Sequence, residues 1–110
     1  MKATANQLDD LFDVIKSRKG QDPSSSYTAR LMAKGTQKCA QKLGEEAVEL
    51  VIAATANNRT ELVTESADLL YHWLVLLAER GIAPEDVYAE LARREGVSGL
   101  DEKAARPKDA

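Results

Sequence analysis

The stretch that decides the fold runs from residue 36 to residue 80, "TQKCAQKLGEEAVELVIAATANNRTELVTESADLLYHWLVLLAER". In its first half, apolar residues recur at the i, i+3, i+4, i+7 spacing of an amphipathic helix. These positions are Leu43, Ala47, Leu50, Val51 and Ala54. The pattern predicts a long helix from residue 36 to about residue 56, where "ANNR" interrupts it.

A second long helix is predicted from about residue 59 to Arg80. Asn58 with Glu61 three positions later resembles a helix cap, and Gly81 is typical of the position after a helix end. The apolar residues between them fall on more than one face: Leu62, Val63, Leu69, Leu70, Trp73, Leu74, Leu76 and Leu77. So wide an apolar surface needs partners on two sides, which favours a helical bundle completed by dimerisation.

Shorter helical patterns flank this pair. One begins near Leu8, one covers residues 27 to 34 with Ser26 as its cap, and one starts at Pro84. No segment shows the alternation of a β-strand, so the predicted fold class is all-α, with two long antiparallel helices at its centre. We interpret residues 1–96 as the folded domain and residues 97–110 as a basic, mobile C-terminal tail.

Length and charge exclude several classes of protein. A chain of 110 residues is enough for one domain, and its formal net charge of −3 argues against a nucleic-acid partner held by bulk electrostatics. No run reaches the roughly 20 apolar residues that span a bilayer, so no membrane partner is expected. The single Cys39 cannot form an internal disulfide, and we expect a packed thiol and a cytoplasmic location.

The predicted helix pair brings four acidic residues to matching heights. In an antiparallel pair, residues that face each other are about equally far from the turn. Glu46 and Asp68 are centred on residue 57, and so are Glu49 and Glu65. Each helix contributes two carboxylates at i, i+3 spacing, so a single acidic patch is predicted.

A divalent cation would remove the repulsion within such a patch. Sites with only oxygen ligands suit hard ions, which predicts Mg²⁺ as the cofactor. The alternative is a solvated acidic face, or acids paired with Lys38 and Lys42. A di-iron bundle needs two Glu-x-x-His pairs, and the chain has only His72, which we interpret as a packed or capping residue.

Glu-Glu-x-x-Glu at 45–49 with Glu-x-x-Asp at 65–68 resembles the signature of the all-α, MazG-like nucleoside triphosphate pyrophosphohydrolases. Within them, the segments "SYTARL", "KGTQKCAQKLGEEAVELVIAA", "ESADLLYHWLVLLAERGI", "VYAELARREG" and "SGLDEKAARP" look like the phosphoribosyl-ATP pyrophosphohydrolase family. The likeness extends from about Leu8 to Arg106.

This resemblance implies Mg²⁺-dependent hydrolysis of phosphoribosyl-ATP to phosphoribosyl-AMP and pyrophosphate, the second step of histidine biosynthesis. It also implies a homo-oligomer, most simply a dimer. The metal ligands that it implies are Glu46, Glu49, Glu65 and Asp68. Glu45, Glu46 and Glu49 are the expected catalytic residues, with Glu45 the weaker choice as a ligand or base.

The substrate phosphates need cations, and the chain offers them in two places. The expected substrate-binding residues are Arg30, Lys34, Lys38 and Lys42 before the acids, and Lys103 and Arg106 in the tail. Salt bridging within the helix and solvated charge are the alternatives for these side chains. Two other functions stay open, a pyrophosphohydrolase for ordinary or damaged nucleoside triphosphates and a non-catalytic helical interaction module.

Overall fold

The computed structural model describes residues 3–107, so residues 108–110 of the predicted tail lie outside the described part. The element order is α1 (Asn6–Arg18), α2 (Tyr27–Ala33), α3 (Thr36–Thr55), α4 (Arg59–Arg80), α5 (Pro84–Arg93) and α6 (Gly99–Ala105). No strand occurs among these residues, which confirms the all-α class. Nor, between residues 3 and 107, does any helix combine the length and apolar character needed to cross a bilayer.

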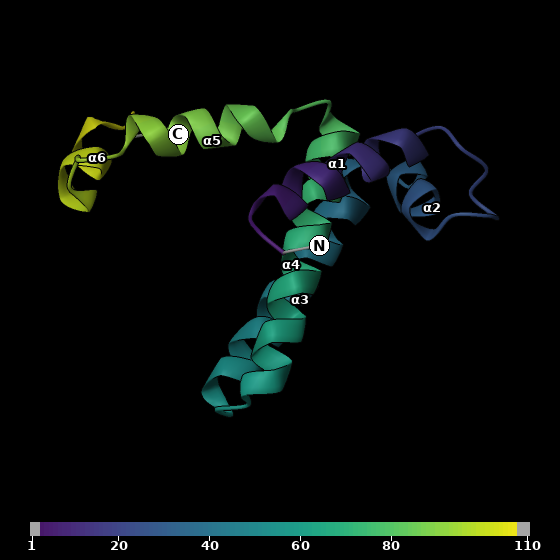
Figure 1. Ribbon diagram of the computed structural model, residues 1–110, viewed down its shortest axis with the longest axis horizontal. Coiled ribbons are helices and arrows are strands. Elements are labelled where there is room, and N and C mark those ends of the chain that lie inside the picture. The colour runs from purple at the N-terminus through teal and green to yellow at the C-terminus, as the bar shows by residue number, and fades with distance from the viewer. Residues whose placement is uncertain (1–2, 108–110) are drawn as a thin grey trace.

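Helices α3 and α4 run side by side as an antiparallel pair, as predicted (Figure 1). The Asn58 side chain caps α4 by accepting a hydrogen bond from the backbone N–H of Glu61 at 3.0 Å. Such a cap stabilises a helix by about 1 kcal/mol. At the other end, Gly81 takes a left-handed conformation with φ of 70°, which glycine adopts without strain. Both predicted bounds of the second long helix are therefore confirmed.

The hydrophobic core lies at one end of this pair, where α1 and α2 pack on α4 (Figure 1). Leu74 and Val75 of α4 are completely buried, and each such burial contributes about 1.5–3 kcal/mol. Ile15 from α1 and Cys39 from α3 are 1% exposed. The prediction that Cys39 is a packing residue is confirmed.

The opposite end of the α3–α4 pair projects away from this core (Figure 1). Large apolar side chains there are exposed to solvent: Val48, Val51, Ile52, Leu62 and Val63. The radius of gyration is 16.0 Å, larger than the roughly 13 Å of a compact domain of this length. Within the described chain, the projecting helices therefore pack mainly on each other.

Helices α5 and α6 form an arm that extends from the core end (Figure 1). The arm is joined to the body at its start, where the Tyr88 hydroxyl donates to Asp9 Oδ1 at 3.0 Å. Helix α6 departs from the predicted mobile tail of residues 97–110, because Gly99–Ala105 are helical. It is capped by Ser98, and its Glu102 is buried against the guanidinium of Arg93 at 2.7 Å.

Candidate functional site

Three carboxylates meet between α3 and α4. Glu46, Glu49 and Glu65 each offer one oxygen that lies within 4.8 Å of the other two. Glu46 and Glu65 are half-buried, whereas Glu49 is exposed. The antiparallel register that the sequence predicted accounts for this meeting, because Glu49 and Glu65 are equally far from the turn.

Burial and the closeness of these acids raise the pKa values of two of them. Burial, followed by the proximity of Glu49, raises the pKa of Glu46 above its ordinary value. Burial together with the neighbouring Glu46 and Glu49 raises the pKa of Glu65 to about 7. Loss of both protons is therefore unfavourable unless a positive charge enters the cluster.

The cluster also contains polar atoms without partners. Glu46 Oε2 and Glu65 Oε2 are buried, and neither has a hydrogen-bond partner in residues 3–107. Buried carboxylate oxygens that lack donors are costly, and a hard cation would satisfy them. The residues present thus fit an oxygen-coordinated ion such as Mg²⁺.

Asp68 and Glu45 take different places from these three. Asp68 is not part of the group of oxygens within 4.8 Å, although it is near enough for its charge to raise the pKa of Glu46 after larger effects of burial and Glu49. Glu45 accepts hydrogen bonds from Gln41 at 2.8 Å and from Lys42 at 3.1 Å. These bonds hold Glu45 outside the cluster on the solvent side of α3.

His72 is buried, in agreement with the reading of a packed residue. Its Nδ1 donates to the backbone carbonyl oxygen of Asp68 at 2.9 Å, and its ring meets Tyr71 edge to face. This bond ties the ring to the turn of α4 that carries Asp68. A direct ligand role is not needed to explain its position.

A cationic cavity of about 270 Å³ lies beside the acidic cluster. Its lining comes from α2, the following turn and α3: Tyr27, Arg30, Leu31, Lys34, Lys38 and Lys42. All four cations that the sequence predicted near the start of α3 are therefore brought together. Lys42 is also paired with Glu45, so the salt bridge foreseen as an alternative exists for this one side chain.

Lys38, Lys42 and Glu46 occupy successive turns of α3, so the cavity and the acidic cluster are two ends of one stripe. Eight residues of helix separate Lys38 from Glu46, a rise of about 12 Å. A ligand with several phosphate groups can reach both ends. The arrangement is suited to a polyphosphate together with a divalent ion.

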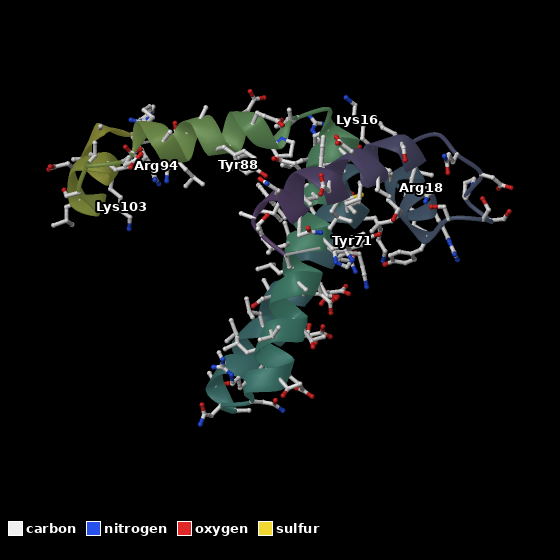
Figure 2. All side chains as sticks on the ribbon, in the orientation of Figure 1. Lys16, Arg18, Tyr71, Tyr88, Arg94 and Lys103 are labelled. Atoms are coloured by element: carbon white, nitrogen blue, oxygen red, sulfur yellow. The ribbon has the colours of Figure 1, made fainter. Side chains whose placement is uncertain are left out.

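Lys103 and Arg106 are not brought to this site. Both belong to the α6 end of the arm, and Lys103 lies far from Tyr71 of the body (Figure 2). Arg106 donates to Glu102 at 3.4 Å, within the arm itself. The two predicted tail contacts thus stand apart from the acidic cluster of their own chain.

Tyr27 lines the cavity but is not among the substrate-binding residues predicted from the sequence. The only available signal was its place in "SYTARL", next to the predicted cap Ser26. Ser26 does cap α2, accepting from the backbone N–H of Ala29 at 3.1 Å. This cap fixes the helix start that carries the tyrosine.

Comparison with known proteins gives a consistent set of relatives. The family model described as "Phosphoribosyl-ATP pyrophosphohydrolase" matches residues 8–95. A "Phosphoribosyl-ATP pyrophosphatase" of Parvibaculum lavamentivorans is 67% identical over 106 residues, 96% of this chain and 97% of the relative. Proteins of the same name from Gluconobacter oxydans and Ruegeria pomeroyi are each 59% identical, covering 93% and 92% of this chain and 77% and 96% of their own lengths.

Proposed function

Because the chain belongs to the phosphoribosyl-ATP pyrophosphohydrolase family, we propose that it hydrolyses phosphoribosyl-ATP to phosphoribosyl-AMP and pyrophosphate with the help of Mg²⁺. This reaction belongs to histidine biosynthesis. One observation carries the proposal. Glu46 and Glu65 bury carboxylate oxygens that have no hydrogen-bond partner among residues 3–107, and Glu46 shares α3 with two of the four cations that line the cavity.

Glu46, Glu49 and Glu65 are the proposed central metal ligands, with Asp68 completing the set from the next turn of α4. A bound Mg²⁺ would neutralise charge on the triphosphate and make the attacking water more acidic. The protein's part is to hold these oxygens on two rigid helices, so that no loop has to be ordered when the substrate arrives.

A carboxylate of the cluster is the proposed acceptor for the proton of the attacking water. Glu46 and Glu49 are better suited to this role than Glu45, whose two oxygens already accept from Gln41 and Lys42. For Glu45 we propose a supporting role, in which it orients Lys42 at the boundary between the cluster and the cavity.

Arg30, Lys34, Lys38 and Lys42 are the proposed phosphate contacts. Arg30 is on α2 and Lys34 is the residue that follows this helix, and two lysines of α3 complete the cationic part of the cavity lining. Of these four, Lys42 alone is paired with an acid among the residues described. Four cations around one cavity repel each other, and phosphate oxygens would offset that cost.

A second copy of the chain is the proposed cover for the projecting half of the α3–α4 pair. The exposed valines and isoleucine of this surface form a patch of the kind that monomers rarely leave in water. Dimerisation would also give Lys103 and Arg106 a site to act on, since their arm points away from the cluster of its own chain (Figure 2). The proposed contacts of these two residues are therefore made in the partner's site.

The direct test is pyrophosphate release from phosphoribosyl-ATP by the purified protein, with and without Mg²⁺. We expect Mg²⁺-dependent release, much faster than from ATP or deoxynucleoside triphosphates. Faster release from the ordinary triphosphates would instead identify a general nucleotide pyrophosphohydrolase. No release from any of them would leave a helical interaction module and overturn the proposal.

A further inference from the structure

Tyr27 carries an aromatic ring that is about half exposed and makes no ring-stacking contact within residues 3–107. The side chain is 49% exposed, although it lines the wall of the cationic cavity. Its hydroxyl makes no hydrogen bond to another residue of the described range, and no cation or second ring there stacks on it. Replacing the ring should therefore change the free energy of unfolding little. Its place in the cavity wall suits contact with a bound ligand.

The backbone around Tyr27 is held firmly. Ala29 is buried, and Ser26 caps the helix that begins at Tyr27. The next side chain, Thr28, shares a hydrogen bond with the Tyr71 hydroxyl, which joins α2 to α4. An aromatic side chain on such a support has few rotatable bonds and loses little entropy when it contacts a flat ligand.

Tyr27 also stands close to the cations and to the route toward the acids. The pKa of Lys42 is raised mainly by its hydrogen bond to Glu45, and the Tyr27 phenol adds a smaller effect of the same sign. Lys42 in turn precedes Glu46 by one helical turn. The ring is thus within reach of a nucleotide whose phosphates run along the Lys42 to Glu46 stripe.

We infer that Tyr27 is the nucleobase platform of this site, on which the adenine ring of the substrate stacks while its phosphates contact the cavity lysines and the metal-binding carboxylates. This inference rests on the proposed function and adds to it a contact with the nucleobase. Stacking on an aromatic side chain suits every base with an exposed face. The phenol also lies near cationic side chains. Because cations are attracted to the faces of aromatic rings, they would favour a base that stacks on Tyr27.

The test compares binding of two probes in the presence of Mg²⁺, measured by calorimetry. One is the non-hydrolysable nucleotide α,β-methylene-ATP, and the other is inorganic triphosphate, which has no base. For Tyr27→Leu we expect binding of the nucleotide to weaken about tenfold or more, the effect of losing one base stack, and binding of inorganic triphosphate to be unchanged. Tyr27→Phe keeps the ring and is expected to bind both probes like the wild type.

Other outcomes overturn the inference. Equal weakening of both probes by Tyr27→Leu would mean that the tyrosine supports the phosphates or the cavity shape. A Tyr27→Phe variant as weak as Tyr27→Leu would assign the contact to the hydroxyl, and unchanged binding by both variants would remove Tyr27 from the site. If the wild-type protein bound neither probe, the proposed function would fail first. Circular dichroism checks that both variants retain the helices.

Discussion

Glu46 on α3 and Glu65 on α4 face each other across the helix pair, and each buries one carboxylate oxygen that accepts no hydrogen bond from residues 3–107. Two helices that pack on each other thus carry an internal repulsion at their contact. This repulsion lowers the stability of the folded chain, and a bound cation would remove it.

Stability without metal should fall as the solution becomes less acidic. The pKa of Glu65 is raised from 4.5 to about 7, and that of Glu46 is raised as well, so the folded chain holds protons that the unfolded chain has released. The free energy of unfolding therefore decreases as pH rises from about 4.5 through about 7. Thermal unfolding across this range should show the decline, and Mg²⁺ should reverse it most strongly at the upper end.

The matched control for this pH effect is Glu61→Gln. Glu61 is an exposed acid one turn before Glu65 on the same helix, and it is not in the cluster. Glu65→Gln should raise the melting temperature of the metal-free protein and remove most of the response to Mg²⁺, whereas Glu61→Gln, which alters only the first turn of α4, should leave the response to Mg²⁺ unchanged. An equal response in the two variants would contradict a metal site at Glu65.

Substitution of the proposed metal-binding acids should lower turnover and leave the fold intact. Loss of one hydrogen bond behind a metal ligand commonly costs 10–100-fold, so we expect Glu49→Gln or Asp68→Asn to lower kcat by at least about 100-fold. Both side chains lie outside the core, and helix content should be retained. Glu45→Gln should have a smaller effect, because Glu45 is paired with Lys42. Full activity of either main variant would exclude that residue from the mechanism.

A charge on the projecting helices should break the dimer. Val63 on α4 is 66% exposed in the single chain, and an aspartate there would be desolvated at the proposed interface. Light scattering should show Val63→Asp shifting toward monomer. Val14→Asp on α1, where the valine is 48% exposed, is the matched control. Monomeric wild-type protein, or the same shift in both variants, would argue against this surface as the contact.

The arm should act on the partner's site. In an equal mixture of Glu49→Gln chains with Lys103→Ala/Arg106→Ala chains, half of the randomly paired dimers contain one chain of each kind. If arms act across the dimer, equal mixing should restore about a quarter of wild-type turnover, since one site in each mixed dimer is complete. If arms act within their own chain, no mixed site is complete, and activity should stay at the level of the separate variants.

Helix α6 should depend on its ion pairs. Glu102 is buried and accepts from Arg93, and this bond, followed by that of Arg106, lowers the pKa of Glu102. A helix of seven residues is unstable by itself, so Glu102→Gln should speed hydrogen exchange across residues 99–105. Glu95→Gln, which changes an exposed acid on the same arm, should not. The lowered pKa also means that this docking weakens as pH falls below 4.5 and through the folded-state pKa.

Periodic and symmetric features of the sequence predicted the fold well. The caps Ser26 and Asn58, the stop at Gly81 and the pairing of Glu49 with Glu65 all follow from local rules or from counting outward from a turn. The sequence predicted less well which individual side chains join the acidic cluster. Glu45, Glu46 and Glu49 look equivalent in a helical pattern, and only its bonds to Gln41 and Lys42 distinguish Glu45 from the other two.

Helix α6 was harder to predict because it has no apolar stripe. Its buried Glu102 instead pairs with Arg93 of α5 and with Arg106 one turn later. Its Leu100 is 83% exposed and so buries little apolar surface. The cavity was likewise hidden, because it forms only when α2 folds back beside α3. The sequence could supply its cations but could not identify Tyr27 as part of its wall.

The placement of Lys38, Lys42 and Glu46 on consecutive turns of one uninterrupted helix has a mechanical meaning. A hydrogen-bonded helix resists stretching, so the gap between the positive and negative ends of the site is set by helix pitch and not by loop motion. Such a site distinguishes ligands by the distance between their charged groups. A molecule whose charged groups are spaced too closely reaches only one end, and selection by length is then a property of the backbone that no single side chain controls.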